Sequence, residues 1–273
     1  MNKLGFRGTA VAAVATLALG GVAGCGNSGS AGGGSGGQAS GQSGSSGSSA
    51  TTQLTKANFA SVVSRAVQQK KSAHMTMSMG SQMQGVGDVK YAAGGPEMKM
   101  TMTMGGHKMQ MRYVDQAMYL KAAGLPSGNK FLKITKASPM MGQMIGKIQS
   151  FGPQGSIQMM KKGLKKLKDV GSTTIGGQKV EHYRATIDTR ALVAKMGMPK
   201  SQMSQVPNTM TEDVYLGSGN LLRRAIVNVM GNKVVVNATK WGEPVHVQAP
   251  PASQVTKMSK SMMGGSTGSG SMG

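Results

Sequence analysis

The chain has 273 residues, with 31 lysines and arginines against 9 acidic residues and a formal net charge of +22. A charge of this size says more about partners than about fold, and it favours an anionic membrane surface or an acidic wall polymer. A composition that only keeps the protein soluble is the alternative. Nucleic acid is not expected as a partner, because aromatic residues that would stack on bases make up only 4% of the chain.

The N-terminal segment has the pattern of a secretory signal. Lys3 and Arg7 precede the uncharged run Thr9–Gly24, which is too short and too rich in glycine and alanine for a transmembrane helix. Val-Ala-Gly then precedes Cys25, the only cysteine, and this sequence resembles the bacterial lipobox. We expect 1–24 to be a lipoprotein signal peptide and Cys25 to carry acyl chains such as palmitate, which would anchor the exported protein to the outer face of the cytoplasmic membrane or cell envelope. A plain signal peptide with a chance cysteine is the alternative.

Composition divides the rest of the chain into three parts. Residues 25–53 are the lipidated cysteine and a flexible Gly/Ser linker, because this segment has almost nothing to bury. Residues 54–256 are long enough for a single α+β domain with its own core, and 257–273 are expected to be a disordered tail.

The domain begins with a predicted helix over Leu54–Lys71. Thr55 is a good N-cap, and Leu54 and Phe59 occupy the two positions of a hydrophobic staple. Apolar residues recur at helical spacing on one side only, so we interpret this helix as structural.

From Ser72 onward the apolar period falls to two, which predicts six short antiparallel strands. The stretch Met98–Met111 reads MKMTMTMGGHKMQM, and Gly105-Gly106 favours a two-residue turn. The pairs expected on one face are Met104–His107, Met102–Met109, Met100–Met111 and Met98–Tyr113, and a second turn at Asp115-Gln116 adds Met111–Leu120 and Tyr113–Met118. The opposite face of the hairpin is polar or basic.

Two helices are predicted next. Ser138 and Pro139 begin the first, whose apolar stripe is Met141, Met144, Ile145 and Ile148. The second spans Ser156–Asp169, with Ile157, Met160, Leu164 and Leu167 on one face and Lys161, Lys162, Lys165 and Lys166 largely on the other. A basic amphipathic helix is a candidate for contact with head groups at a membrane surface. An ordinary solvated helix over a sheet is the alternative.

Strands return near residue 172, with one short helix expected at Arg190–Met198 and further strands up to Trp241. The total is about ten antiparallel strands with helices in a few insertions, which is an α+β layout.

No enzyme and no cofactor are expected. The acidic residues are scattered, mostly at solvent-facing strand positions or turns, and the four histidines lie in different segments. Gly-x-Ser-x-Gly, His-Glu-x-x-His and phosphate-loop motifs are absent from the sequence. Distant residues that converge in space would be the exception.

The lipobox, the segment LTKANFASVVSRAVQQKKSAHMTM, the strand GGQKVEHYRATIDT and the hairpin VYLGSGNLLRRAIV together resemble the actinobacterial LppX/LprAFG-type lipoproteins. The resemblance is diffuse and spans most of Leu54–Val255. It implies a LolA/LolB-like fold: a curved antiparallel half-barrel, helices over its concave face, and an apolar cavity for the acyl chains of lipids or glycolipids. It supplies no catalytic residues. The 26 methionines depart from the aliphatic cavities of that family, so the lipid class is not carried over.

Three functions remain. The first is a lipid-binding lipoprotein that transfers or senses a lipid or glycolipid, as a monomer with a partner transporter that the sequence does not identify. Its expected cavity residues are Met98, Met100, Met102, Met109, Met111, Tyr113, Met118, Leu120, Met141, Met144, Ile145, Ile148, Met160 and Leu164. The second is a Cu(I)-binding protein, because thioethers suit Cu(I) and the hairpin tip gathers Met102, Met104, His107 and Met109. The third is a structural protein that interacts with the wall.

Overall fold

The structure is a computed structural model that describes residues 53–92, 95–125, 127–135, 137, 160–190, 207–229 and 231–257. The predictions for the signal peptide, Cys25, the linker up to residue 52, the helix at 139–148 and the tail beyond residue 257 lie outside these residues, as does most of the helix expected at Arg190–Met198. Within the described ranges, no helix has the length and apolar character needed to cross a membrane.

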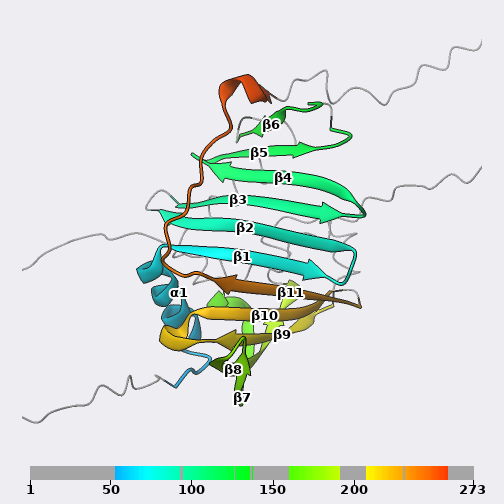
Figure 1. Cartoon of the computed structure of the whole chain (residues 1–273). Coiled ribbons are helices and arrows are strands. Elements are labelled where there is room, and N and C mark those ends of the chain that lie inside the picture. Colours follow the sequence, from blue (N-terminus) through cyan, green and yellow to red (C-terminus); the bar gives the residue numbers. More distant parts are fainter. Residues whose placement is uncertain are drawn as a thin grey trace, which may run out of the picture.

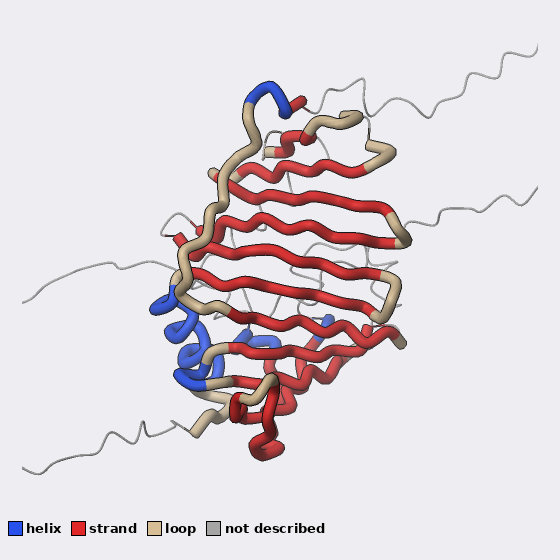
Figure 2. The backbone as a smooth tube through the Cα atoms, viewed as in Figure 1, coloured by secondary structure: helices blue, strands red, loops and turns tan. Residues whose placement is uncertain are grey.

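The twelve strands found among the described residues belong to one sheet, in the order β12-β6-β5-β4-β3-β2-β1-β11-β10-β9-β8-β7 (Figures 1 and 2). Their bounds are β1 Ser72–Met79, β2 Met83–Ala92, β3 Gly95–Met104, β4 His107–Val114, β5 Ala117–Ala122, β6 Phe131–Ile134, β7 Leu164–Ile175, β8 Gln178–Asp188, β9 Thr209–Leu216, β10 Leu222–Val229, β11 Asn232–Thr239 and β12 Val255–Lys257. Every pairing is antiparallel except that of β12 with β6. The predicted class, a curved antiparallel sheet in an α+β protein, is confirmed, with twelve strands rather than about ten.

Helix α1 (Phe59–Lys70) precedes the sheet. It begins later than predicted, because Asn58 is the N-cap and Thr55 lies in the turn before it, where the backbone N–H of Thr55 donates to Asn58 Oδ1 at 2.7 Å. The helix ends at Lys70, and the C-cap residue Lys71 has a left-handed conformation with a positive φ of 63°. Leu54 and Phe59 are both buried in the main core cluster, but with Asn58 as the N-cap they do not occupy the N′ and N4 positions of the predicted staple.

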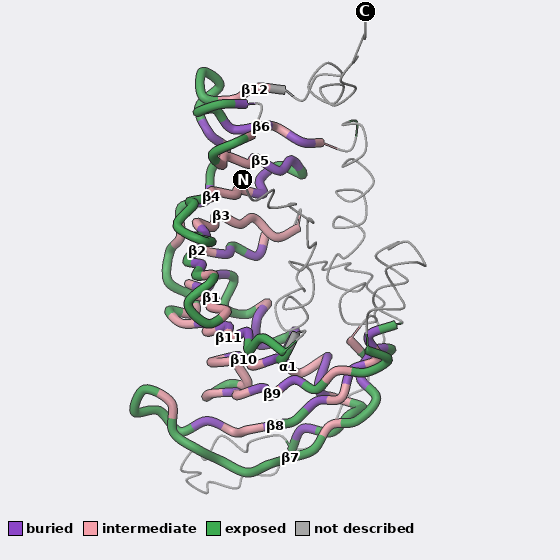
Figure 3. The backbone as a smooth tube through the Cα atoms, turned by 90° about the vertical axis from the view of Figure 1, so that its right-hand side faces the viewer, coloured by how far each residue is buried: buried purple, intermediate pink, exposed green. Residues whose placement is uncertain are grey.

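The main core lies between α1 and the concave side of the sheet, which curves toward the helix at its β7–β8 end (Figure 3). Phe59, Val63 and Val67 of α1 contribute the helical side of this core. The sheet side comes mainly from β8 to β11, and the rings of Phe59 and Tyr183 meet with centroids 6.3 Å apart. Helix α1 therefore covers one end of the concave side and fixes the curvature there.

The helix predicted over Ser156–Asp169 is wrong from Leu164 onward, and its beginning, residues 156–159, lies outside the described residues. Residues 160–163 are helical, but Leu164 begins strand β7, which pairs with β8 through Ile175. The register shifts between Leu164 and Lys166, so a β-bulge at Lys165 inserts one extra residue. A bulge brings Leu164 and Leu167 to the same side of the strand, and their spacing of three residues imitates a helical stripe.

After β11 the chain crosses the convex side of the sheet to reach β12 (Figure 1). Ala249 and Val255 pack on Ala117, Tyr119 and Phe131. The 3₁₀ turn η2 (Ala252–Gln254) leads into β12, and a second turn, η1 (Ser218–Asn220), joins β9 to β10. This segment therefore covers part of the convex side of the sheet and does not cover the concave side.

Candidate functional site

The methionine-rich hairpin of β3 and β4 has the predicted register. Gly105 and Gly106 form its turn with φ of 54° and 82°, values that glycine adopts without strain. The observed pairs include Met104–His107, Met102–Met109, Met100–Met111, Met98–Tyr113, Met111–Leu120 and Tyr113–Met118. Because this pairing is confirmed, the predicted apolar residues of β3, β4 and β5 lie on one side of the sheet.

This apolar side continues beyond the hairpin. One row of cross-strand neighbours runs from β1 to β6 and consists of Met75, Gly87, Met100, Met111, Leu120 and Leu132. We call the concave side of β1–β5 the methionine face; its methionines are Met75, Met77, Met79, Met83, Met98, Met100, Met102, Met104, Met109, Met111 and Met118. Most are half-buried, whereas Met75, Met102 and Met118 are buried and Met104 is 55% exposed.

Two glycines of β2 belong to the methionine face and let it pack closely. A Cβ at Gly87 would lie 2.3 Å from the carbonyl oxygen of Lys99, so a side chain there would force β3 away from β2. A Cβ at Gly85 would touch Met102 and Met77, whose side chains fill the space that the glycine leaves. Flexible thioether side chains thus replace the missing β2 side chains.

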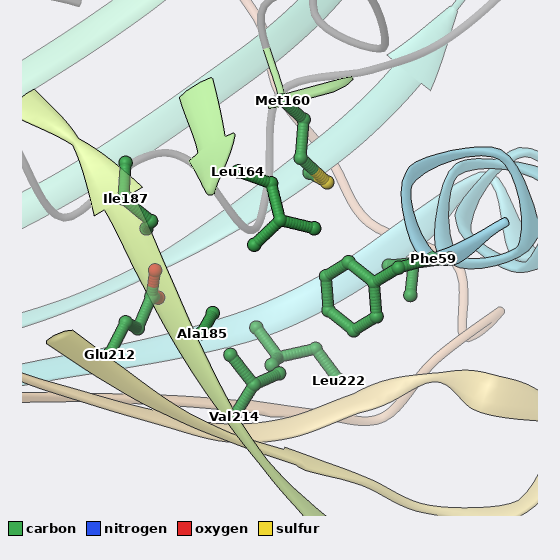
Figure 4. Close-up of a pocket in the computed structure, with 9 residues that line it drawn as sticks. Phe59, Met160, Leu164, Ala185, Ile187, Glu212, Val214 and Leu222 are labelled. Atoms are coloured by element: carbon green, nitrogen blue, oxygen red, sulfur yellow. The ribbon is translucent and has the colours of Figure 1, made fainter. Parts of the chain in front are cut away.

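At the other end of the concave side, α1 and strands β7–β10 enclose an apolar pocket (Figure 4). Its volume is about 20 Å³, which is room for about one water molecule. The lining residues are Phe59, Val63, Met160, Leu164, Ala185, Ile187, Glu212, Val214 and Leu222. The lining is apolar apart from a single polar group, the carboxyl of Glu212.

Glu212 points from β9 into this pocket, beside Ile187, Ala185 and Val214 (Figure 4). Its side chain is only 7% exposed, and burial raises the pKa of its carboxyl from 4.5 to about 7, with a smaller contribution from the negative charge of Asp213. No described residue gives this carboxyl a hydrogen bond or a cation. A buried polar group without a partner is costly, so the position needs an explanation.

Glu212 is an exception to the prediction that the acidic residues mostly lie at solvent-facing strand positions or turns. Strand β9 reads TMTEDVYL, in which Met210, Glu212, Val214 and Leu216 alternate with outward residues. Glu212 thus occupies an apolar position of a strand with period two, and this was the signal available in the sequence.

The other predicted site residues have mixed outcomes. Met160 and Leu164 do lie together in the pocket, although Leu164 belongs to β7 and not to a helix.

Lys161 and Lys162 are exposed in the helical turn before β7. Lys165 and Lys166 are exposed on β7, and Lys165 Nζ forms an ion pair with Asp188 Oδ2 at 3.0 Å. The predicted single basic helix face therefore does not exist, and its lysines divide between a turn and an edge strand. Met141, Met144, Ile145 and Ile148 lie outside the described residues.

The convex side carries paired polar groups. Asp88 accepts from His74 at 2.8 Å and from Lys99 at 3.0 Å, and these partners hold the pKa of its carboxyl below the usual value against the opposing effect of burial. Asp213 is placed likewise between His182 and Arg184, each at 2.8 Å, and the pKa of its carboxyl is lowered too. The two sides of the sheet thus differ, since these convex carboxylates have partners and Glu212 has none among the described residues.

The candidate copper residues occupy two adjacent pairs at the end of the hairpin, Met102–Met109 and Met104–His107. Same-face partners in such pairs have Cβ atoms about 4.5–5.5 Å apart, a separation that permits soft ligands to converge. Elsewhere in the described part of the chain, His, Cys, Asp and Glu form no group of three or more that could hold a metal ion.

Comparison with known proteins returns solved structures but no sequence relatives. No protein-family profile and no curated protein matches the chain. LprF from Mycobacterium bovis is 14% identical, with a TM-score of 0.48 over 71% of this chain and 96% of that one. The Mycobacterium tuberculosis lipoprotein LppX is also 14% identical, with a TM-score of 0.48 over 70% of this chain and 99% of that one. Both carry names of the lipoprotein group that the sequence resembles.

Proposed function

We propose that this protein is an exported lipoprotein that binds the acyl chains of a lipid or glycolipid on the concave side of its sheet. The observation that carries the proposal is the methionine face itself. Its apolar side chains are cross-strand neighbours on one side of five strands, and most of them are only half-buried. An apolar surface of this extent marks a binding site, and methionine adapts its shape to irregular chains.

In this proposal the bound chain lies along the methionine face, on the same concave side as the small pocket beneath α1. The exposed lysines Lys161, Lys162 and Lys166 near that pocket would meet anionic head groups, while Lys165 is already paired with Asp188. Acyl chains on Cys25 would hold the protein at the membrane that supplies the lipid. The role is carriage or sensing of lipid rather than catalysis, and a partner transporter would receive the ligand.

Native mass spectrometry of the full chain purified from its own membrane tests the proposal. We expect a co-purified lipid of defined mass, and uptake of added lipid after delipidation. A protein that carries no lipid and takes up none would refute the proposal. A Cys25→Ala variant tests the anchor separately, since it should lose the mass of the acyl chains and leave the membrane fraction.

A second candidate function is Cu(I) binding at the hairpin tip. The observation that favours it is the exposure of Met104 and His107, which form the last pair before the turn. A tightly bound Cu(I) that disappears in a Met102→Leu/Met109→Leu double variant would support it. Tight binding of a wall polymer with neither lipid nor copper would favour an interaction protein instead.

A further inference from the structure

The convex side of strands β4–β6 carries a cluster of cations that the proposed function does not use. We call it the convex basic patch, and its members are Lys108 and Arg112 of β4, Lys121 of β5 and Lys133 of β6. Gln110 pairs with Lys121, so the two β4 members on either side of Gln110 are diagonal neighbours of Lys121. Tyr119 pairs with Lys133, which makes Lys133 a diagonal neighbour of Lys121 from β6. Such neighbours lie about 7–8 Å apart, within the screening length of about 8 Å at physiological salt, so the charges of the patch repel one another.

The protein's own carboxylates do not neutralise this patch. All nine acidic side chains of the chain lie within the described residues, and none of them belongs to β4, β5 or β6. Their ion pairs with described residues involve strands β1–β3 and β7–β9, and no member of the patch takes part. Lys99, which faces Arg112 from β3, is already paired with Asp88, so the patch ends there. The charge of the patch is therefore left for a partner.

Buried aromatic rings hold three of the four cations in place. The guanidinium carbon of Arg112 lies 5.1 Å from the ring centroid of Phe131, and Lys121 Nζ lies 5.8 Å from the same centroid. Lys133 Nζ lies 5.6 Å from the ring centroid of Tyr119. Both rings are buried in the cluster that packs against the segment crossing the convex side. Cation–π contacts with such rings restrict the charged side chains, which then lose less conformational entropy when they bind a partner.

We propose that the convex basic patch binds a linear polymer of phosphodiester-linked units, which is an acidic wall polymer. Arginine and lysine are the side chains that bind phosphate groups in proteins. A linear polyanion presents several phosphates in succession, so it offsets the charges of neighbouring strands together, whereas a single phosphate offsets only part of them. This inference goes beyond the proposed function and does not depend on lipid binding.

A polymer fits this surface better than a membrane does. The patch is on the opposite side of the sheet from the methionine face, so a bilayer docked on it would leave that face turned away from the lipids. The patch also lies near the β12 end of the strand order, whereas the lysines proposed to meet head groups lie in or just before β7, at the other end (Figure 1). Two basic regions at opposite ends of one sheet allow the protein to contact a membrane and a wall polymer with different surfaces.

Polymer binding by charge-matched variants tests the inference on the full chain. The probe is poly(glycerol phosphate), titrated calorimetrically at several salt concentrations into a Cys25→Ala parent chain, which has no cysteine for an acyl anchor. The patch variant changes all four cations of the convex basic patch to glutamine. The matched control changes four exposed lysines in and just before β7 to glutamine, namely Lys161, Lys162, Lys166 and Lys168.

Both variants lose four positive charges, but only the patch variant should lose the polymer. We expect its affinity to fall at least about tenfold at physiological salt, and that of the control to fall about twofold or less. The slope of log K against log salt should become shallower by about 3 in the patch variant alone, because each phosphate contact to a single-stranded polyanion contributes about 0.7. Lys108→Gln/Lys121→Gln, which keeps the ring contacts of Arg112 and Lys133, should show about half of this change and guards against misfolding of the fourfold variant.

Vesicles of phosphatidylglycerol are the membrane arm of the experiment. They should bind the patch variant about as well as the parent chain, and fatty-acid uptake should be unchanged. Equal losses of polymer affinity in the patch and control variants would show that only the net charge matters, and would overturn the inference. It is also overturned if the parent chain does not bind the polymer. A patch variant that keeps the polymer but loses the vesicles would assign the patch to a membrane instead.

Discussion

Strands β7–β11 and strands β1–β5 form one continuous concave side but build it from different residues. Valine, alanine, leucine and isoleucine dominate the concave side of β7–β11, which we call the aliphatic face, and most of them are buried in one core cluster with residues of α1. The methionine face has long, flexible side chains, most of them half-buried. Stiff β-branched residues suit a surface with a permanent partner, whereas methionine suits one whose partner varies in shape. We infer that the aliphatic face stabilises the fold and that the methionine face serves binding.

The largest expected effect compares truncations on the two faces. Leu222 is fully buried, so Leu222→Ala should lower the free energy of unfolding by about 3 kcal/mol, because it leaves a cavity under α1. Met100 is half-buried, and Met100→Ala should cost only about 1 kcal/mol. Urea unfolding followed by circular dichroism measures both values. Equal losses would show that the two faces contribute alike to stability.

Glu212 should make the stability of the aliphatic face depend on pH. Because the pKa of its carboxyl rises from 4.5 to about 7 on folding, the folded protein binds more protons than the unfolded chain in that window. The free energy of unfolding should therefore fall as the pH rises from 4.5 to about 7, by about 3 kcal/mol in total, and show no further loss from this group above it. Urea titrations across this range measure the slope.

Glu212→Gln is the control for this slope, and it should flatten the curve between these pH values. Asp88 and Asp213 have lowered pKa values, so the stability that they contribute is present above their unfolded pKa and is lost at more acidic pH. Their effect has the opposite sign and lies below the window of Glu212. An unchanged slope in Glu212→Gln would assign the pH dependence to other groups.

A charge on the methionine face should block lipid uptake with little cost to folding. Met100→Glu places a carboxylate among half-buried methionines, and we expect at least about a tenfold loss of affinity for a fluorescent fatty acid, because the chain would have to desolvate that charge. Thr101→Glu adds the same charge to the opposite side of β3, where Thr101 pairs with Val86 and Gln110, and should bind normally. Equal losses in both variants would place the lipid elsewhere.

The smallest effect distinguishes apolar character from sulfur chemistry. Met102→Leu/Met109→Leu keeps the volume and the apolar surface of the hairpin but removes two thioethers, so lipid uptake should change by about twofold or less. A Met98→Leu/Met111→Leu variant, away from the tip, is the matched control. If only the tip variant loses a function of the protein, that function depends on sulfur, and copper becomes the better explanation.

The sequence predicted the methionine half of the sheet well, because alternation, the Gly105-Gly106 turn and the turn at Asp115-Gln116 are all local signals. The prediction was wrong at residues 164–169, because a β-bulge gave the apolar residues of a strand the spacing that is typical of a helix. The pocket could not be predicted from the sequence, for a different reason. Phe59, Leu164 and Glu212 meet only because the sheet curves around α1, and pairing patterns carry no information about that curvature. The apolar position of Glu212 in β9 was visible in the sequence, but its apolar surroundings come from α1, β7, β8 and β10, which no local pattern brings together.

Photolabelling tests the central claim most directly. The full chain is loaded with a fatty acid that carries a diazirine, irradiated, and digested, and the modified residues are identified by mass spectrometry. The account predicts labels on concave residues of β1–β5, such as Met100 and Met111, and loss of these labels when excess unlabelled fatty acid is present. Labels on convex residues such as Thr101 and Gln110, or labels that excess fatty acid does not displace, would contradict it.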